Sequence, residues 1–389
     1  MYKVNLLNNI TSSELEKFDK AKYEVGAELS NPDALMLRSA KIHDMEFNPE
    51  LLCIARAGAG VNNIPLDRCA EEGIVVFNTP GANSGAVKEL VICALFLASR
   101  DIIGGAEWIK TVVDKGDEIP ALVEKQKSKY TGPEISGKTL GLVGLGAIGG
   151  KTANAAVALG MNVIGFDPYI SEATKAELSP QVVLANSIEE LFESSDFISL
   201  NLPYTEKTKG FVNKDSIAKM KKGVRIINAA RAELVDDDDI LAALEAGDVS
   251  KYVTDFPNAK TAGAPGVIAI PHLGASTPES EDNCVGMAAS EIIGYVENGN
   301  IVNSVNFGNI LLEGANGSRV TVIHNNTSEM NDKITSAVSS VGLSVANVQS
   351  VTSKNEKFAY SVLDVSGAND ELVNALKAID GVVRVRVLK

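Results

Sequence analysis

The fold of this chain follows from residues 143–149, which read Val143-Gly144-Leu145-Gly146-Ala147-Ile148-Gly149. An apolar run before the glycines, residues 138–143, predicts a strand, and residues 150–159 after them predict a helix. A second apolar run ends at Asp167, 18 residues after the last glycine of the loop. A glycine loop between strand and helix, followed at this distance by an acid, is typical of dinucleotide binding. The alternative is a glycine turn in an unrelated α/β sheet.

Each glycine of this loop has a separate physical role. Gly144 permits a tight turn from strand to helix, Gly146 leaves room for a pyrophosphate beside the backbone, and Gly149 allows close packing of helix and strand. The amides and the dipole at the helix start attract the phosphate charge. Asp167 accepts hydrogen bonds from ribose hydroxyls and repels a 2'-phosphate, so we expect NAD rather than NADP as the cofactor.

The composition argues against several classes of protein. The 389 residues carry 36 lysines and arginines against 50 acids, a net charge of −14, which argues against nucleic-acid binding. No run approaches the roughly 18 apolar residues of a membrane span, and the N-terminus has no signal-peptide pattern. We therefore expect a cytoplasmic protein without a membrane partner. Four cysteines without a CxxC pair and only three histidines predict free thiols and no metal site.

The order of the predicted elements divides the chain into three domains. Short strands alternate with helices at the start, and a later helix returns to this part, which predicts a discontinuous, flavodoxin-like substrate domain of residues 1–94 and 276–306. The glycine loop lies in a Rossmann NAD-binding domain of residues 95–275. Residues 307–318 are rich in glycine and asparagine and predict a linker. Residues 319–389 have the βαββαβ order of a ferredoxin-like module.

Three polar side chains follow predicted strands, at the edge where open α/β sheets bind ligands. Arg231 comes after an apolar strand, and its planar guanidinium suits a carboxylate or a carbonyl oxygen. His272 follows another apolar run and can pass a proton to or from a hydroxyl near neutral pH. Asp255 ends a strand and can accept a hydrogen bond from the nicotinamide end of the cofactor. The alternatives are a surface loop position for Arg231 and a structural role for His272.

Two further arginines follow strands of the first domain. Arg38 and Arg56 each come after an apolar run, where they are placed to form a cationic pocket that the acidic chain otherwise lacks. Two arginines indicate an anion stronger than one carboxylate, such as a phosphate, and solvated loop arginines are the alternative. Residues 236–239 are four aspartates at the start of a predicted helix, and we interpret them as helix-capping rather than metal-binding.

Five motifs, in order along the chain, make residues 1–306 similar to the NAD-dependent D-2-hydroxyacid dehydrogenases. They are Arg56-Ala-Gly-Ala-Gly-Val-Asn-Asn-Ile, Asn78-Thr-Pro-Gly-Ala-Asn, Gly144-Leu-Gly-Ala-Ile-Gly, Asn228-Ala-Ala-Arg231 and Pro271-His272-Leu-Gly-Ala-Ser. The C-terminal module, residues 319–389, resembles an ACT domain. The resemblance implies NAD-dependent oxidation of a phosphorylated 2-hydroxy acid, D-3-phosphoglycerate, to 3-phosphohydroxypyruvate. That reaction is the first step of the phosphorylated route to L-serine.

The resemblance also implies a role for each motif residue. Arg231 orients the carboxylate and carbonyl of the substrate, and His272 is the acid/base for the hydroxyl proton. Arg38 and Arg56 hold the phosphate of the substrate, and Gly58 offers a backbone amide to its carboxylate. The positions implied for the cofactor are Gly144, Gly146, Ala147, Ile148 and Gly149 at the pyrophosphate, Asp167 at the ribose, and Ala229, Ala230, Asp255, Gly274 and Ala275 at the nicotinamide.

The chain departs from the family pattern at two places. The family usually has a glutamate five residues after the strand-end aspartate, where it hydrogen-bonds the catalytic histidine, but here that position is Lys260. A lysine cannot stabilise an imidazolium, so Lys260 either takes another part in catalysis or faces solvent while His272 works unaided. In the ACT-like module, His324 and Asn326 match part of a serine-binding pattern that lacks its Pro-Gly, and Ser344 stands in place of an asparagine. L-Serine is then an effector, or the module serves only for assembly.

The family pattern and a long helix predicted from Gly85 to beyond Trp108 imply a homodimer or a homotetramer. The nearest alternative function is that of a glyoxylate or hydroxypyruvate reductase, and the two arginines of the first domain and the C-terminal module argue against it. Another alternative is an NAD-sensing scaffold that has lost its chemistry. Retention of both Arg231 and His272 argues against that alternative.

Overall fold

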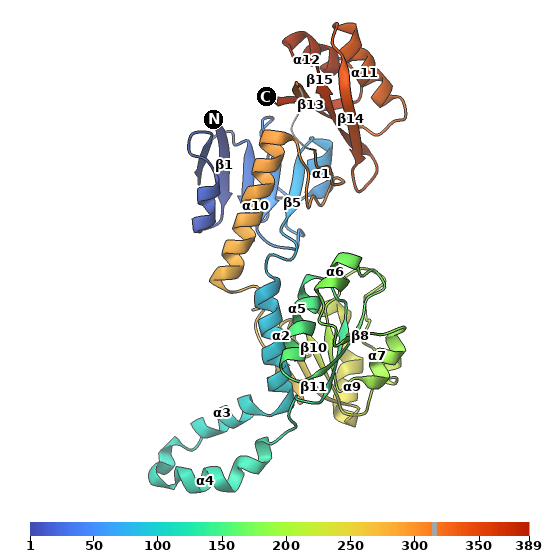
Figure 1. Ribbon diagram of the computed structural model, residues 1–389. Helices are drawn as coiled ribbons and strands as arrows, with labels where there is room; N and C mark the ends of the chain where they lie inside the picture. The colour runs from blue at the N-terminus through green and yellow to red at the C-terminus, as the bar shows by residue number, and fades with distance from the viewer. Residues whose placement is uncertain (313–316, 389) are drawn as a thin grey trace. The chain divides into compact units, whose positions relative to one another are not determined.

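The computed structural model describes residues 1–312 and 317–388, and the chain forms two compact units. Unit 1 comprises residues 1–83 together with 278–389, and unit 2 comprises residues 84–277 (Figure 1). Unit 1 is thus discontinuous in sequence, because its two segments stand on either side of unit 2 along the chain.

The boundaries of the units differ from those expected at residues 94 and 275. Helix α2 (Ser84–Ser99) is continuous across residue 94 and packs on α5 (Ala147–Ala158), so the whole helix belongs to unit 2. The second segment of unit 1 begins with helix α10 (Pro278–Asn298). A continuous helix keeps its residues in one body, which is why the boundary lies at its first residue.

The first sheet of unit 1 has five parallel strands in the order β2-β1-β3-β4-β5. This order confirms the flavodoxin-like fold expected for the first domain. The strands are β1 (Tyr2–Leu7), β2 (Tyr23–Gly26), β3 (Ala34–Leu37), β4 (Cys53–Arg56) and β5 (Val75–Asn78), with the 3-10 helix η1 (Ser13–Lys17) between the first two. The sequence did not predict β2, which is a short edge strand with little apolar character.

Residues along each strand of this sheet alternate between two hydrophobic clusters, one on each face. Phe77 packs on the face covered by α10, where its ring lies 5.8 Å from that of Tyr295. The preceding residue, Val76, points to the other face and shares a cluster with Cys69 of α1 (Leu66–Glu71). Helices on both faces thus fix the sheet, and the loops at its carboxyl edge are left to bind ligands.

Unit 2 is built on seven parallel strands in the order β12-β11-β10-β9-β6-β7-β8. The chain runs from β6 outward to β7 and β8 and then crosses to β9 on the other side of β6. This confirms the Rossmann arrangement that the glycine loop predicted. The strands are β6 (Thr139–Val143), β7 (Asn162–Phe166), β8 (Val182–Leu184), β9 (Phe197–Leu200), β10 (Val224–Asn228), β11 (Val249–Thr254) and β12 (Val267–Ala269).

Helices cover both faces of the seven-stranded sheet, with α2 and α5 on one face and α7 and α9 on the other. The aspartates at the start of α9 cap it as expected, because the Asp236 carboxylate accepts hydrogen bonds from the amides of Asp238 and Asp239. The helices of unit 2 that follow α5 are α6 (Glu172–Glu177), α7 (Ile188–Ser194), α8 (Lys214–Ile217), η4 (Ala232–Leu234) and α9 (Asp237–Ala246).

The single long helix expected from Gly85 onward is broken in the structure. α2 ends at Ser99, and the Asp101 carboxylate caps a new helix, α3 (Ile102–Lys110), by accepting a hydrogen bond from the Gly104 amide. No described residue of α3 or of the next three elements is buried. These elements project from unit 2 as an arm (Figure 1) and comprise η2 (Val113–Glu118), α4 (Ile119–Gln126) and η3 (Lys127–Tyr130).

The C-terminal module of unit 1 has the element order βαββαβ and confirms the ferredoxin-like expectation. Its antiparallel sheet has the strand order β14-β15-β13-β16, and α11 and α12 pack on one face. The elements are β13 (Ser318–Asn325), α11 (Met330–Ser340), β14 (Val345–Thr352), β15 (Phe358–Val365), α12 (Asp370–Lys377) and β16 (Val382–Leu388).

The other face of this module packs on the rest of unit 1. Tyr360 belongs to the same hydrophobic cluster as Tyr295 of α10, and its hydroxyl donates to the Gly299 carbonyl at 2.7 Å. The guanidinium of Arg386 donates to the Val296 carbonyl at 2.8 Å, near the end of α10. The module expected as a separate domain is therefore part of the first compact unit.

The expected linker, residues 307–318, is in part a folded piece of unit 1. Phe307 is fully buried and forms a β-bridge with Ser353, and Ile310 is also buried. These apolar side chains pack in the cluster that joins the module to α10, which glycine and asparagine content did not reveal. Residues 313–316 lie outside the described residues.

Candidate active site

Loops after the parallel strands of unit 2 carry the predicted site residues to one edge of the sheet. Gly144 follows β6, Asp167 follows β7 and Asp255 follows β11. Arg231 and His272 each come three residues after the end of a strand, β10 and β12 respectively. Parallel strands share their carboxyl edge, and the connections leave β6 and β9 in opposite directions, which makes this the point where such sheets bind ligands.

The three glycines of the loop occupy different surroundings. Gly144 has a φ of 92°, and a Cβ there would lie 2.6 Å from the Asn201 carbonyl oxygen. A Cβ at Gly149 would lie 2.0 Å from the Gly144 carbonyl oxygen, whereas one at Gly146 would meet no described atom within 4 Å. Gly146 is also the N-cap of α5, and no described side chain caps that helix. The amides of its first turn are therefore available to an anion.

The carboxylate of Asp167 is held in place at the end of β7. Its Oδ2 accepts a hydrogen bond from the Leu145 amide and its Oδ1 accepts one from the Tyr169 amide, each at 2.9 Å. The first bond joins the acid directly to the glycine loop. A carboxylate keeps further lone pairs for ribose hydroxyls. Together with Ala147 and Ile148 in the first turn of α5, these groups fit the pyrophosphate and ribose of NAD.

Asp255 is a buried carboxylate that comes directly after β11. It is 2% exposed, and burial raises the pKa of its carboxyl group, while the charges of His272 and Arg231 lower it. Its Oδ2 accepts a hydrogen bond from the Gly274 amide at 3.2 Å, and no described donor reaches its Oδ1. A buried acceptor without a protein donor fits the carboxamide at the nicotinamide end of NAD, beside Gly274 and Ala275.

The turn that carries Arg231 is braced by Asn228 at the end of β10. The buried Asn228 side chain accepts hydrogen bonds from the amides of Ala230 and Arg231 and donates one to the Arg231 carbonyl at 2.8 Å. The Tyr252 hydroxyl of β11 lies 3.3 Å from the same side chain. The Arg231 guanidinium is exposed beyond the half-buried Ala229 and Ala230, and its Nη1 donates to the Ala230 carbonyl at 2.6 Å.

The imidazole of His272 lies against an aromatic ring. The ring centroids of His272 and Phe256 are 4.5 Å apart, with the planes inclined by 48°. The sequence did not single out Phe256, because an aromatic residue after a strand carries no specific signal. The contact covers one side of an otherwise exposed imidazole with an apolar surface and restricts its orientation.

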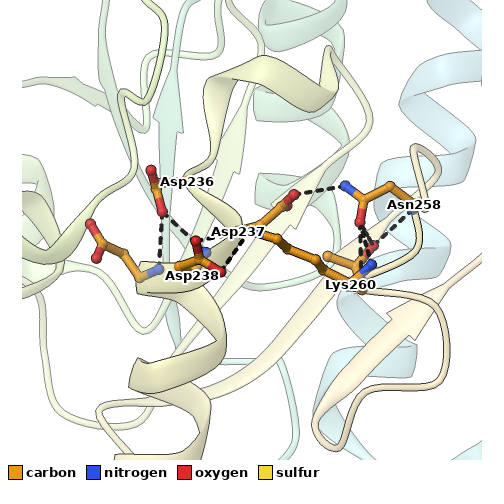
Figure 2. Close-up of polar contacts among 7 residues, drawn as sticks. Asp236, Asp237, Asp238, Asn258 and Lys260 are labelled. Atoms are coloured by element: carbon orange, nitrogen blue, oxygen red, sulfur yellow. Dashed lines mark hydrogen bonds and ion pairs between the residues drawn. The ribbon is translucent and has the colours of Figure 1, made fainter.

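Lys260 forms an ion pair with the start of α9. Its Nζ lies 2.7 and 2.8 Å from the two carboxylate oxygens of Asp238, and Asn258 of the same loop donates to Asp237 at 2.8 Å (Figure 2). The hydrogen bond to Asp238 raises the pKa of Lys260, so the ammonium form is stabilised. Among the described residues no hydrogen bond or ion pair joins Lys260 to His272. The structure thus pairs Lys260 with Asp238 of α9, and its catalytic role stays a prediction.

In unit 1 the predicted anion-binding residues lie at the ends of β3 and β4, with Arg38 directly after β3, Arg56 as the last residue of β4 and Gly58 in the loop that follows. The Arg56 Nε donates to the Arg38 carbonyl at 2.9 Å. Gly58 has a φ of 153°, and a Cβ there would lie 2.9 Å from the Arg56 Nη1, so the glycine leaves room for this guanidinium. Asn8 braces the Arg38 loop, because its Oδ1 accepts hydrogen bonds from the amides of Arg38 and the next two residues. The sequence analysis missed Asn8, although its place after β1 is a signal.

An acidic residue that the sequence analysis did not single out pairs with Arg38. Glu281, in the first turn of α10, lies 2.7 Å from the Arg38 Nη1. Nearby, burial raises the pKa of the Cys284 thiol, whereas Thr79 and the two arginines lower it. An acid in the first turn of a helix is ordinary, so nothing in the sequence predicts this long-range pair.

His324, expected to bind an effector, is a buried residue of the C-terminal sheet, and its effector role stays a prediction. It is 2% exposed, and its Nδ1 and Nε2 are hydrogen-bonded to the Asn325 carbonyl and the Ser361 hydroxyl, each at 2.8 Å. Burial lowers the pKa of its imidazole, which favours the neutral form. Asn326 donates to the Glu356 carbonyl at 2.9 Å.

The third expected effector residue, Ser344, lies far from the other two within one chain. His324 pairs with Ala359 at one end of β15, whereas Ser344 precedes Val345, which pairs with Val365 at the other end. Six residues of extended strand correspond to about 20 Å. A single chain therefore does not gather the three residues into one serine site.

The sequence analysis also made predictions about the cysteines, metal binding and membrane spans. The four cysteines are free thiols, as predicted. Among the described residues no group of three histidine, cysteine, aspartate or glutamate side chains is placed to hold a metal ion. Across residues 1–312 and 317–388 no helix has both the length and the apolar character that crossing a bilayer requires.

Comparison with known families agrees with the geometry of unit 2. Residues 94–274 match the family model described as "D-isomer specific 2-hydroxyacid dehydrogenase, NAD binding domain". The seven-stranded unit is therefore a Rossmann NAD-binding domain of that type.

Curated relatives are similar over most of the chain. D-3-phosphoglycerate dehydrogenase of Bacillus subtilis (strain 168) is 35% identical over 312 residues, which cover 76% of this chain and 56% of the relative. D-3-phosphoglycerate dehydrogenase of Homo sapiens is 33% identical over 301 residues, which cover 75% of this chain and 54% of the relative. The chain thus spans about half the length of the curated relatives it matches.

Solved structures share the fold. The NAD+-bound 3-phosphoglycerate dehydrogenase of Entamoeba histolytica has a TM-score of 0.60 at 27% identity and covers 78% of this chain and 98% of its own. The holo form of Rhodotorula graminis D-mandelate dehydrogenase has a TM-score of 0.66 at 24% identity and covers 80% of this chain and 99% of its own. At that identity the second likeness concerns the fold alone.

Proposed function

We propose that the protein is an NAD-dependent D-2-hydroxyacid dehydrogenase that oxidises D-3-phosphoglycerate to 3-phosphohydroxypyruvate. The observation that carries this proposal is that the loops after β10, β11 and β12 bring Arg231, buried Asp255 and His272 to the carboxyl edge of an NAD-binding sheet. Relatives named D-3-phosphoglycerate dehydrogenase match three quarters of the chain and support the choice of substrate. The reaction would open the phosphorylated route to L-serine.

The residues of unit 2 divide the chemistry between them. Bound NAD+ supplies the acceptor for the hydride that leaves the hydroxyl-bearing carbon. The guanidinium of Arg231 binds the carboxylate and the hydroxyl oxygen of the substrate through its planar donors. The imidazole of His272 takes the hydroxyl proton as the carbonyl forms, so it must be neutral at the start of oxidation. One hydride and one proton thus leave the substrate.

Residues of the glycine loop and of the strand ends would hold the cofactor. The first-turn amides at Ala147 and Ile148 would bind the pyrophosphate, beside the open space at Gly146. Asp167 would bind the ribose hydroxyls and exclude the 2'-phosphate of NADP. The free Oδ1 of Asp255 would accept a hydrogen bond from the nicotinamide carboxamide.

Unit 1 has a candidate anion-binding pocket of its own. We assign the phosphate to Arg38 and Arg56, whose fork-shaped donors suit its oxygens. The Gly58 amide donates to the Arg56 carbonyl at 2.8 Å, so it would bind the substrate carboxylate only by exchanging that hydrogen bond.

Formation of NADH from NAD and D-3-phosphoglycerate tests the proposal, with hydrazine added to trap the keto product. D-Glycerate in place of the phosphorylated acid, and NADP in place of NAD, are the controls. We expect turnover with NAD and the phosphorylated acid, and a loss of about 100-fold or more in His272→Asn. Turnover with D-glycerate alone would refute the phosphate site, and no turnover with either acid would refute the dehydrogenase.

A glyoxylate or hydroxypyruvate reductase is the second candidate function. The pairing of Glu281 with Arg38 favours it, because the carboxylate offsets one of the two charges assigned to a phosphate. The reductase would turn over hydroxypyruvate with NADH at least as well as its phosphorylated form, so one comparison of the two keto acids separates the candidates.

We also propose that the protein acts in the cytoplasm as a homodimer or homotetramer. The arm of unit 2 exposes a group of large apolar side chains that a second copy could cover: Ile102, Ile103, Ile109 and Val113. The C-terminal module then serves assembly, and L-serine regulation stays a separate prediction. Light scattering measures the oligomeric state. If L-serine gives no heat in a calorimetric titration and no inhibition in the activity assay, it is excluded as an effector.

A further inference from the structure

The cationic pocket at the edge of the first sheet contains an acid of its own. The Glu281 Oε1 lies 2.7 Å from the Arg38 Nη1, and among the described residues this is the only ion pair of Arg38. Arg56 is attached to the same loop through its hydrogen bond to the Arg38 carbonyl. The carboxylate of Glu281 therefore offsets the charge of Arg38 in the structure.

The position of Glu281 is set by the packing of α10 rather than by a need of the helix itself. The first turn of α10 already has another acid, Glu279, to complement the helix dipole. The next residue, Asp282, accepts a hydrogen bond from the Ser12 hydroxyl at 2.6 Å, which fixes the start of the helix against the first domain. With the helix held there, the Glu281 side chain reaches Arg38.

We propose that Glu281 is a specificity-determining residue that limits the preference of the site for phosphorylated acids. It occupies Arg38 until the phosphate of a substrate displaces it, an inference that rests on the proposed function of this pocket. A phosphate carries nearly two negative charges and can displace one carboxylate from a guanidinium, but it is also repelled by that carboxylate. An unphosphorylated acid leaves the pair of Arg38 and Glu281 intact, so Glu281 does not affect its binding.

The size of the effect follows from the charges. One carboxylate charge about 6 Å from a phosphate dianion in water weakens binding by roughly tenfold, and salt at physiological strength reduces this to about threefold. The two side chains of the pair are 36% and 43% exposed, so the Coulomb energy is calculated with the dielectric constant of water rather than with that of a protein interior. Removal of the charge from Glu281 should therefore strengthen phosphate binding by about three- to tenfold.

The test compares Glu281→Gln with Glu279→Gln, which removes the same charge from the same helical turn without breaking an ion pair among the described residues. KM values for D-3-phosphoglycerate and D-glycerate are measured with NAD at fixed ionic strength. A calorimetric titration with inorganic phosphate measures the Kd of phosphate at the same pocket without any turnover.

In Glu281→Gln we expect the KM for D-3-phosphoglycerate and the Kd for inorganic phosphate to fall about three- to tenfold, with the KM for D-glycerate unchanged. Glu279→Gln should change none of these values. An unchanged or raised phosphate Kd in Glu281→Gln would overturn the proposal. Failure of the proposed function looks different, because the wild type would then not oxidise D-3-phosphoglycerate while the phosphate titration would still report on Glu281.

Discussion

Replacing Glu291 with glutamine removes a buried carboxyl group from the core of unit 1. Glu291 lies in α10 and is 7% exposed, its Oε1 accepts a hydrogen bond from the Asn303 side chain at 2.9 Å, and no described donor reaches its Oε2. Burial raises the pKa of Glu291 to about 8, and the Asn303 amide opposes this shift. The folded protein therefore holds the proton at neutral pH.

The raised pKa makes the stability of unit 1 fall as pH rises. In the unfolded chain Glu291 titrates near 4.5, so between about pH 4.5 and pH 8 the folded state binds more protons than the unfolded state. The free energy of unfolding then decreases by about 1.4 kcal/mol per pH unit, to a total of at most about 5 kcal/mol. Below pH 4.5 ionisation of Glu291 does not lower the free energy of unfolding, and above pH 8 the decrease has reached its full size.

Glutamine keeps the shape and the acceptor for Asn303 but cannot ionise, so Glu291→Gln should remove this pH dependence. At pH 5 the variant and the wild type should have similar thermal midpoints. At pH 8.5 the variant should unfold about 10 °C higher, because a domain of this size shifts by about 2–4 °C per kcal/mol.

Calorimetry from pH 5 to pH 9 measures the difference, with Glu279→Gln as the control for an exposed glutamate of the same helix. Each protein is compared with the wild type at the same pH, so titration of other groups cancels. Parallel pH profiles for the wild type and Glu291→Gln would refute the reasoning, because the buried carboxyl would then titrate alike in the folded and unfolded states.

Three further substitutions test the active site. Asp167→Ala should raise the KM for NAD about tenfold and let NADP support turnover, because the charge that repels the 2'-phosphate is gone; persistent rejection of NADP would contradict this role. Phe256→Ala should lower kcat about tenfold with the KM for NAD unchanged, and Phe256→Tyr should restore it, whereas equal kcat values would mean that the ring does not orient His272. Lys260→Ala should keep kcat within about twofold, since an exposed ion pair contributes little; a fall of about 100-fold would instead support a catalytic lysine.

Much of the fold could be predicted because its signals are local. The apolar run at residues 138–143 predicts β6 to within one residue, and the six elements of the C-terminal module follow one another as expected. The break after Ser99 was missed, since the apolar pattern continues past it while the capping bond from Asp101 depends on one side chain. β2 was missed because a short edge strand gains its stability from its neighbour β1 rather than from its own residues.

The sequence by itself determined the arrangement of the glycine loop and its acid. Gly144, Gly146, Gly149 and Asp167 lie on one strand-helix-strand unit, so their spacing along the chain fixes their arrangement in space. The hydrogen bond from the Leu145 amide to Asp167 closes that unit at 2.9 Å.

Only the tertiary structure decided which charged groups face one another elsewhere. Lys260 pairs with Asp238 and Arg38 with Glu281, and in each case the partners come from elements that meet only when the sheets are packed. His324, which the sequence suggested as a ligand-binding residue, is buried with both ring nitrogens hydrogen-bonded. Local sequence patterns predict backbone conformation and burial. The partner of a side chain depends on the paths of loops and the positions of helices, and these are determined by the packing of the whole chain.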